Sequence, residues 1–355
     1  MQVSPTGKKL RLVRARAAGN PLWCAWQVTY RCNFRCRFCG YWHDPMGRRP
    51  EPTVADFADG SRKLAALGSL LVSMAGGEPL LREDLPEIVG EVGRFHFPFI
   101  TTNGWLVTRR AATDLMAAGL WGASVSIDYA SPERHDAARL MDGAWDAAWR
   151  AVELLSAARV HKWQRVNVMC VLLHDNLEDI EPLIRMAAER GAYFMVQPYG
   201  VQKTGSRTFV HPPASSERLL ALRRRYPSFL SNPYYLGRFD DFHAGGIPGC
   251  LAGRAFFNID STGDVAICVE NKHRPVANLF RHSARTVTRR LRAASQANDC
   301  TCCWYNCRGE VESLYHPHGL ARSLPTLLFD RGRPNGKTLN PEAASGDIMS
   351  DSMAG

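Results

Sequence analysis

The sequence has no run of about 18 or more apolar residues, so a transmembrane helix is excluded, and it has no N-terminal signal peptide. At 355 residues the chain is long enough to bury a core without disulfide bonds, so its 11 cysteines are not needed as covalent staples. These absences predict a reducing, cytoplasmic setting. Clustered cysteines in that setting indicate metal or redox chemistry.

Lysine is scarce, and most of the positive charge comes from arginines spread along the whole chain. The formal net charge is +10 and the pI about 9.2. The densest basic stretches, 8–16 and 281–292, are not interleaved with aromatic residues, as a nucleic-acid-binding surface would be. We therefore expect no nucleic-acid partner and a generally solvated surface, with an anionic substrate left open.

Short apolar runs with strand character recur from residue 22 to residue 199, separated by stretches with helical periodicity. This alternation predicts parallel strands connected by helices, in the α/β class. Six such units are too few to close an eight-stranded TIM barrel, so we expect a partial (β/α)6 TIM-like barrel with ligands at the C-terminal ends of its strands. The predicted strands are 22–30, 70–75, 98–102, 123–128, 166–173 and 193–198, and the predicted helices are 54–67, 85–94, 109–118, 145–158 and 177–190.

Capping residues and breaks in this rhythm divide the chain. Thr53, with Asp56 three positions later, is expected to cap the first helix, and Asn176 the last. Residues after 203 lose the rhythm, and two strands at 255–259 and 264–269 are expected to form a hairpin. The predicted parts are an N-terminal arm (1–20), the barrel (21–202), a bridge (203–248), a small cysteine-rich extension (249–325) and a disordered tail (326–355).

Three cysteines, Cys32, Cys36 and Cys39, follow the first predicted strand on one short loop. Three thiolates can bind three irons of a four-iron, four-sulfur cluster and leave the fourth iron open to a non-protein ligand. The same spacing also fits half of a zinc site or a buried redox trio. Its form, Cys-x3-Cys-x-aromatic-Cys with Phe38 as the aromatic, resembles the signature of the radical S-adenosylmethionine (SAM) enzymes. The resemblance implies that SAM binds the open iron of a [4Fe-4S] cluster and is split by one electron into a 5′-deoxyadenosyl radical.

The stretch "MAGGEPLL" follows the second predicted strand, at the place of the family's Gly-Gly-Glu-Pro motif. Without that context the stretch would be a common turn. Two glycines let the backbone approach a ligand closely, and a carboxylate can satisfy a cation. The resemblance implies that Gly76, Gly77 and Glu78 meet the ammonium group of SAM.

Further resemblance lies at the ends of later strands, in "TTNG" and "SIDYASPERHDAAR". Tyr129 stands where the family usually has glycine, and the glycine expected after the motif's arginine is missing. His135 and Asp136 match the family motif, yet they are equally expected as a helix cap and a surface charge. The resemblance implies cofactor contacts for Phe38, Asn103, Ser126, Asp128, Arg139 and Gln197.

Six further cysteines gather near the C-terminus. The first pair has the form Cys-x12-Gly-x4-Cys, which resembles the start of the SPASM and twitch extensions that carry auxiliary iron–sulfur clusters. The cysteine expected near Val311 is absent, so the resemblance implies one auxiliary [4Fe-4S] cluster, although four thiolates suit zinc equally well. Cys24 and Cys170 lie within apolar strands and are expected to be packing residues. The expected ligands are Cys250, Cys268, Cys303 and either Cys300 or Cys307; Cys302 is the sixth cysteine.

These motifs predict a radical SAM enzyme that abstracts a hydrogen atom from its substrate and receives its electron from a donor such as a flavodoxin or ferredoxin. Only 31 residues precede Cys32, whereas peptide-modifying members usually carry a recognition domain there. This favours a small molecule of secondary metabolism, such as a sugar, aminocyclitol or nucleoside, in a net oxidation. The alternatives are a maturase of a ribosomally made peptide and a zinc-binding or electron-transfer protein without SAM chemistry. Candidates for a general base, by position only, are Tyr129, Tyr199, Glu270 and Glu310.

Overall fold

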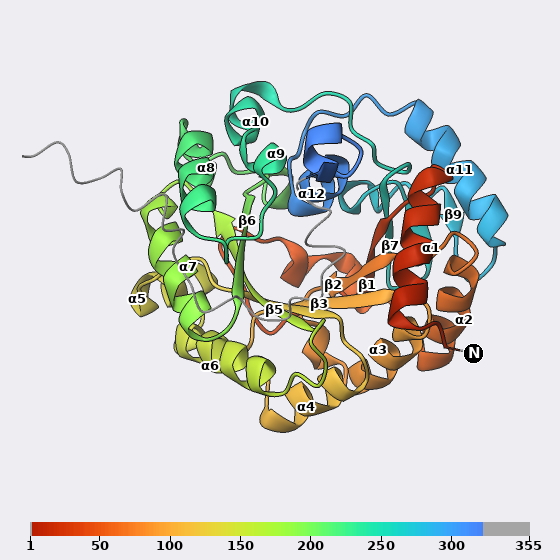
Figure 1. The fold of residues 1–355 in the computed structure, drawn as a ribbon, viewed down its shortest axis with the longest axis horizontal. Helices are drawn as coiled ribbons and strands as arrows, with labels where there is room; N and C mark the ends of the chain where they lie inside the picture. The colour runs from red at the N-terminus through yellow and green to blue at the C-terminus, as the bar shows by residue number, and fades with distance from the viewer. Residues whose placement is uncertain (1, 322–355) are drawn as a thin grey trace, which may run out of the picture.

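One curved sheet organises the protein. The computed structural model describes residues 2–321. The strands lie in the order β6-β5-β4-β3-β2-β1-β7-β8-β9, and the sheet curves without closing (Figure 1). Strands β1 to β7 run parallel to one another, whereas the pairs β7–β8 and β8–β9 are antiparallel. The strands are β1 (Trp23–Thr29), β2 (Leu71–Gly76), β3 (Phe97–Thr102), β4 (Gly122–Ser126), β5 (Arg165–Leu172), β6 (Tyr193–Pro198), β7 (Phe256–Ile259), β8 (Asp264–Ala266) and β9 (Ala277–Asn278).

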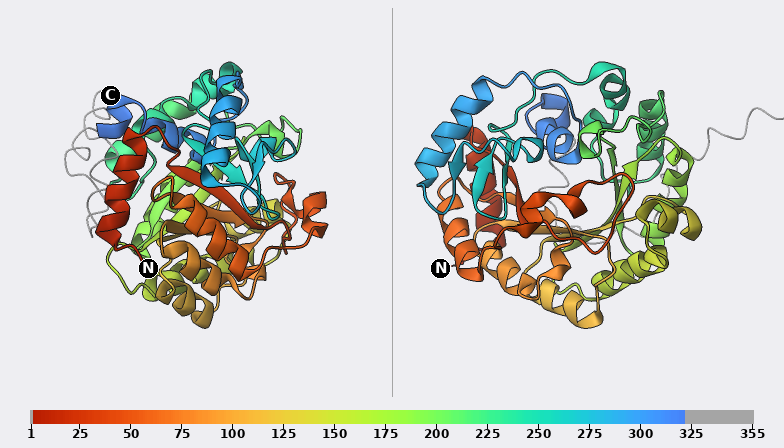
Figure 2. Two further views of the ribbon diagram at one scale, coloured as in Figure 1. Left: turned by 90° about the vertical axis from the view of Figure 1, so that its right-hand side faces the viewer. Right: turned by 180° about the vertical axis from the view of Figure 1, so that it is seen from behind.

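The outer face of the barrel strands is covered by the connecting helices, as Figures 1 and 2 show. Each helix buries one apolar stripe: α7 buries Ile180, Leu183, Ile184 and Ala187, which recur at helical spacing. This periodicity of apolar residues is the pattern from which the helices are predicted. The helices are α2 (Val54–Leu64), α3 (Leu85–Gly93), α4 (Arg109–Ala117), α5 (Pro132–Arg139), α6 (Ala144–Ala157) and α7 (Ile180–Glu189).

The six predicted strands and five predicted helices of the barrel are confirmed to within a few residues. The cap at Thr53 is confirmed as a full capping box with Asp56. The cap at Asn176 is wrong, because its amide instead donates to the carbonyl oxygens of Asp128 and Val171 at 2.8 and 2.9 Å. Asn176 therefore ties the chain after β4 to the end of β5. Helix α5 was not expected, since its sequence PERHDAAR has no apolar stripe.

Residues 203–248, expected as a bridge, contain α8 (Ser215–Arg225), α9 (Pro233–Leu236) and α10 (Phe239–Gly245). They follow the free edge of β6, where Phe194 pairs with Phe229 and the Val196 amide donates to the hydroxyl of Ser231. Helices α9 and α10 have only 4 and 7 residues, and α8 is rich in arginine and buries only two large apolar side chains, Leu219 and Leu222. This is why the sequence pattern did not reveal them.

The predicted hairpin is confirmed as β7 and β8, but it is not a separate layer. Strand β7 pairs in parallel with β1, with Trp23 opposite Phe256 and Trp26 opposite Ile259. The cysteine-rich extension therefore continues the barrel sheet and ends in α11 (Ala284–Gln296) and α12 (Asn306–Ser313).

Helix α12 stands at the open side of the barrel and contacts α9, β1 and β7. Tyr305, just before it, packs against Gly200 beyond the end of β6, whereas Leu314, just after it, packs with Phe97 and Trp121 at the strand beginnings. Helix α12 thus runs antiparallel to the barrel strands, from the mouth of the barrel to its floor. Helix α1 (Pro5–Ala17), expected only as an arm, adds Leu12 and other residues to the same floor cluster.

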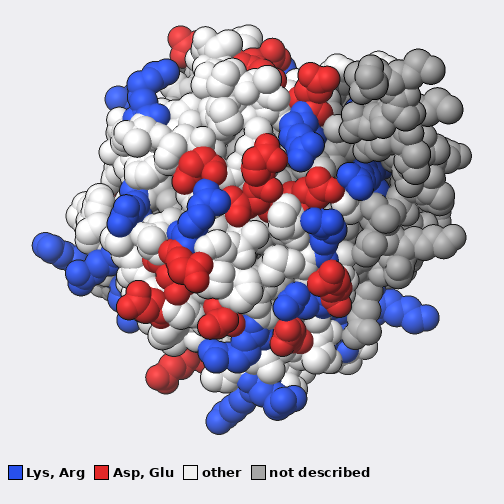
Figure 3. Space-filling model, turned by 90° about the vertical axis from the view of Figure 1, so that its left-hand side faces the viewer, with Lys and Arg blue, Asp and Glu red and all other residues white. Residues whose placement is uncertain are grey.

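The surface carries charges of both signs. On the face where α7 and α8 lie, basic and acidic side chains are interspersed (Figure 3), and Glu181 pairs with both Arg218 and Arg225. Among residues 2–321, no helix combines the length and apolarity needed to cross a membrane. The predicted tail 326–355 lies outside the described residues.

Candidate active site

The first cysteine set, Cys32, Cys36 and Cys39, follows β1 and lines one cavity at the C-terminal ends of the strands. The Arg37 amide donates to the Ala138 carbonyl at 3.0 Å, which fastens this loop to α5. Burial raises the pKa of Cys32 to about 12 and that of Cys36 to about 11. Thiols of such high pKa are weak free nucleophiles, but a bound metal would deprotonate them. Three cysteines on one loop therefore fit a ligand set.

The glycine motif brings the loop after β2 against the chain that leads into the cysteine loop. A Cβ atom on Gly76 would lie 1.8 Å from the Thr29 carbonyl oxygen, and one on Gly77 would lie 1.9 Å from that of Arg31. Gly76 also has φ of 132°, a conformation that favours glycine. The amide of Gly77 donates to Thr29 at 3.0 Å. Both glycines are therefore required for the two loops to touch.

Glu78 is 1% exposed and joins the loops after β2 and β3. Its carboxylate accepts from the Thr102 hydroxyl at 2.8 Å and from the amides of Asn103 at 2.7 Å and Leu80 at 3.1 Å. Burial raises the pKa of Glu78 to about 7 against these donors. The Asn103 side chain donates to Asn33 at 2.8 Å. Glu78 thus positions Asn103, and Asn103 reaches the cysteine loop.

Arg139 lines the cavity at the end of α5, with Nη1 4.0 Å from Cys36 Sγ. Asp128 holds it: one carboxylate oxygen accepts from Nε at 2.9 Å and from Nη2 at 2.7 Å, and the other accepts from the Val171 amide. Asp128 is fully buried and does not border the cavity. The structure therefore places Asp128 behind Arg139, as the residue that positions it, and not at the expected cofactor contact.

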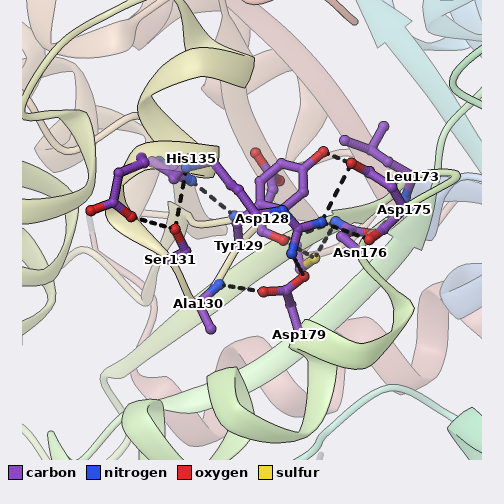
Figure 4. Close-up of polar contacts among 12 residues, drawn as sticks. Asp128, Tyr129, Ala130, Ser131, His135, Leu173, Asp175, Asn176 and Asp179 are labelled. Atoms are coloured by element: carbon purple, nitrogen blue, oxygen red, sulfur yellow. Dashed lines mark hydrogen bonds and ion pairs between the residues drawn. The ribbon is translucent and has the colours of Figure 1, made fainter.

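Residues near Asp128 form a polar network (Figure 4). His135 is buried, and its Nδ1 accepts from the Asp128 amide at 3.2 Å, with a pKa held well below 6.5 by burial. Asp136 accepts from the amides of Gly143 and Trp145 at the start of α6. Asp136 thus acts as a cap at the start of α6, whereas the buried His135 is neither a helix cap nor a surface charge. Tyr129 donates to Asp175 and does not border the cavity.

The cavity has a volume of about 480 Å³ and extends through the barrel interior from the first cysteine set to Phe99 and Trp121. Among the predicted cofactor residues, Phe38, Ser126 and Gln197 also line it. Helix α12 contributes one face to its wall, from Asn306 and Cys307 through Glu310 and Val311 to Leu314. The position of α12 therefore adds a wall to the cavity at the open side of the barrel.

Polar side chains in the deeper part of the cavity were missed by sequence reasoning, except Glu310. Asn167 on β5 is 2% exposed, and its Oδ1 has no hydrogen-bond partner among residues 2–321. Glu310 accepts from the Asn232 amide at 3.1 and 3.2 Å, and burial raises its pKa to about 7. The available signal was the alternation of Arg165 and Asn167 with apolar residues along β5, which marks positions facing the barrel interior.

The second cysteine set is Cys250, Cys268, Cys303 and Cys307. Cys303 lies near enough to Cys250 and Cys268 for their charges to raise its pKa. In the same way, the charges of Cys303 and Cys268 raise the pKa of Cys307. Burial is the main cause that raises the pKa of Cys303 to about 12 and that of Cys268 to about 11. Four enclosed thiols thus converge from the hairpin and from the chain around the start of α12.

Cys300 interacts with Cys302 and with Arg308. The amide of Cys302 donates to the Cys300 sulfur at 3.5 Å, and Cys302 is exposed. Of the two residues left open as the fourth ligand, the structure thus favours Cys307. Cys24 and Cys170, expected to be packing residues, are both 0% exposed within the core.

Arg308 fixes the segments that carry the second cysteine set. Its side chain is fully buried, donates to the carbonyls of Ile247 and Cys303, and pairs with Glu312 at 3.1 Å. Its charge lowers the pKa of Cys303 against the effect of burial. A cation beside several thiols favours their thiolate forms, so this set has the chemistry of a metal ligand set.

Within residues 2–321, no three His, Cys, Asp or Glu side chains lie close enough together to hold a single metal ion. The thiolates of a four-iron cluster each bind a different iron, so they are spaced more widely than the ligands of one zinc ion. The number and chemistry of the donors fit three ligands at the first set and four at the second.

The strand-end loops after β1 to β4 therefore carry a three-cysteine loop, a glycine loop, an asparagine and an arginine around one cavity. The sequence profile of the Radical SAM superfamily matches residues 26–187, which contain all four loops. Residues 26–187 form a radical SAM domain. The chain thus contains a radical SAM domain, the kind of domain that uses a [4Fe-4S] cluster and SAM, and it is an enzyme.

Known proteins extend this radical SAM relationship beyond the barrel. Mycofactocin maturase MftC of Mycolicibacterium smegmatis is 28% identical over 322 residues, which cover 83% of this chain and 79% of MftC. The AdoMet-dependent heme synthase of Methanosarcina barkeri is 31% identical over 212 residues, or 56% of this chain and 57% of the synthase. Streptococcus suis SuiB, solved with the precursor peptide SuiA, shares the fold with a TM-score of 0.55 at 17% identity. That match covers 77% of this chain and 66% of SuiB, so the chain spans just under two thirds of SuiB.

Proposed function

We propose that this radical SAM enzyme modifies a ribosomally made peptide. The observation that carries the proposal is the relationship to the maturase MftC over 83% of the chain. This match extends beyond the barrel, whose strands β1 to β6 lie within Trp23–Pro198. The likeness to SuiB, whose structure contains a precursor peptide, supports the proposal.

We assign the first cysteine set to three irons of the cluster that binds SAM. When bound, this cluster supplies the electron that splits SAM and yields a 5′-deoxyadenosyl radical. Gly76 and Gly77 present main chain to the ammonium end of SAM, and Arg139 presents a guanidinium beside Cys36 for its carboxylate. Asn103 and Ser126, at neighbouring strand ends, are placed to bind the ribose.

The reacting residue of the peptide enters the barrel interior below these loops. The cavity there is lined on one side by α12 and contains hydrogen-bonding groups at Glu310 and Asn167, which can orient a polar side chain. Trp42 and Trp105, in the loops after β1 and β3, are 42% and 38% exposed and offer apolar contacts for the flanking residues. We expect a flavodoxin or ferredoxin to deliver the electron.

The test uses anaerobically reconstituted enzyme, dithionite and SAM, with two sets of probes. One set is synthetic peptides matching the short open reading frames beside the gene; the other is a panel of sugars, aminocyclitols and nucleosides. We expect one peptide to raise 5′-deoxyadenosine formation and to lose or gain mass. Conversion of a small molecule, with every peptide unchanged, would overturn the proposal.

A small molecule is the second candidate substrate, favoured by the cavity volume of about 480 Å³ and by the relationship to the heme synthase over 56% of the chain. The same assay separates the two. A variant of Glu310 adds a check, because a deep polar group should matter for whichever substrate enters the cavity.

A further inference from the structure

Lys203 occupies an enclosed position between the two cysteine sets. It ends a short helical turn (Val201–Lys203) that follows β6. Its Nζ lies 5.0 Å from the centre of the Tyr41 ring and 4.9 Å from that of Tyr305, so the ammonium is sandwiched between two aromatic faces. It also pairs with Glu270 at 2.7 Å.

Each neighbour of Lys203 belongs to one of the cysteine regions. Tyr41 follows the first cysteine set, and the charge of Cys39 raises its pKa. Tyr305 lies between Cys303 and Cys307, and Glu270 follows Cys268 by two residues. The ammonium itself acts on the second set, since its charge lowers the pKa of Cys307 while Glu270 acts in the opposite direction.

The Lys203 side chain stays protonated in these surroundings. Interactions with Tyr41, Tyr305 and Glu270 raise its pKa well above 10.5 although burial lowers it. Its side chain is 23% exposed, and that exposed part borders the cavity. A charge held in such surroundings interacts strongly with neighbouring charges because little water screens it.

We propose that the ion pair of Lys203 and Glu270 sets the reduction potential of an auxiliary cluster bound by the second cysteine set, with Lys203 raising that potential and Glu270 lowering it. The inference rests on our assignment of that cluster and not on the class of substrate. Reduction adds one negative charge to a cluster. A nearby cation therefore stabilises the reduced form, and a nearby carboxylate destabilises it.

The measurement is an anaerobic redox titration of the reconstituted full chain, followed by electron paramagnetic resonance. Adding SAM identifies the signal of the first cluster, and the auxiliary signal is the one that SAM leaves unchanged. Lys203→Met should lower the auxiliary midpoint potential, Glu270→Gln should raise it, and Lys203→Arg should keep it near the parent value. In the double variant the two shifts should largely cancel.

Lys272 provides the matched control. Its Nζ lies 4.9 Å from the centre of the same Tyr41 ring, but it pairs with Asp44. Lys272→Met removes the same charge and should shift the auxiliary potential less than Lys203→Met does. Equal shifts from both lysine variants, or an unchanged potential in Lys203→Met and Glu270→Gln with the iron content retained, would overturn the proposal. So would an auxiliary site that holds zinc and gives no redox signal. None of these results depends on finding the peptide, so they are separable from failure of the proposed function.

Discussion

Replacing Asp128 with asparagine tests whether a residue outside the cavity controls SAM binding. Asp128 is fully buried, its partner Arg139 is 7% exposed, and their contacts are 2.7 and 2.9 Å. Removing one charge from a buried pair costs about 3 to 5 kcal/mol, because the other charge is left unpaired. Asparagine keeps the shape and one acceptor oxygen, so we expect a loss near the lower end, about 3 kcal/mol of unfolding free energy.

The same change should also weaken SAM binding, because Asp128 holds Arg139 beside Cys36. Within residues 2–321, Asp128 is the only carboxylate that pairs with Arg139. A charge-assisted hydrogen bond that loses its geometry costs about 1 to 3 kcal/mol, or roughly 5- to 150-fold in Kd. The two quantities are measured by urea unfolding of the anaerobic protein and by equilibrium dialysis with labelled SAM.

Asp136→Asn is the matched control, because its carboxylate contacts only backbone amides at the start of α6 among the described residues. It should cost about 1 kcal/mol of stability, as loss of a helix cap does, and leave the Kd for SAM unchanged. Parent-like SAM affinity in Asp128→Asn, or an equal loss in Asp136→Asn, would refute the positioning role.

Four further outcomes are expected. Changing the whole first cysteine set to alanine should abolish 5′-deoxyadenosine formation while leaving the auxiliary cluster, and undiminished SAM cleavage would contradict the ligand assignment. Iron analysis of the parent should give about eight irons per chain, with about four lost in Cys307→Ala and none in Cys300→Ala; about four irons with one zinc in the parent would favour a zinc staple. Gly77→Ala places a Cβ atom 1.9 Å from the Arg31 carbonyl oxygen, so it should displace the glycine loop and raise the KM for SAM, whereas Gly90→Ala, which meets no atom within 4 Å, should not. Because burial raises the pKa of Glu310 to about 7, its stabilising protonated form is lost as the pH rises through 7. The parent should therefore lose up to about 3 kcal/mol more unfolding free energy than Glu310→Gln between pH 5 and pH 8, and equal pH profiles would show that Glu310 is not so enclosed.

Local patterns were sufficient to predict the barrel and the identity of its motifs. The strand and helix periods lie within single elements, and the cysteine loop and the glycine loop are each contiguous in sequence. Glu78 shows the limit of this information. Its motif marked it as a site residue, but its hydrogen bonds to Thr102 and Asn103 depend on how the loop after β3 packs against it.

Contacts between distant segments could not be predicted in the same way. The choice of Cys307 over Cys300 depends on where α12 begins relative to the hairpin, and the pairing of β7 with β1 depends on a register between residues more than 200 positions apart. Asp128 and Arg139 share one motif, yet the pattern does not say which of them faces the cavity. Lys203 gave no signal, because a lone lysine after a strand is usually solvated.

Helix α12 carries both a member of the second cysteine set and part of the cavity wall, so metal binding at that set is coupled to the position of the wall. Cys307 lies on the first turn of α12, while Glu310 and Leu314 carry its inner face down to the floor of the barrel. Metal that binds the second cysteine set would therefore also hold this helix against β1 and β7. Iron loading is therefore expected to help hold α12 in place as a wall of the cavity. An enzyme depleted of auxiliary iron would leave the barrel interior more open along this side, so that solvent could enter the space that receives the substrate.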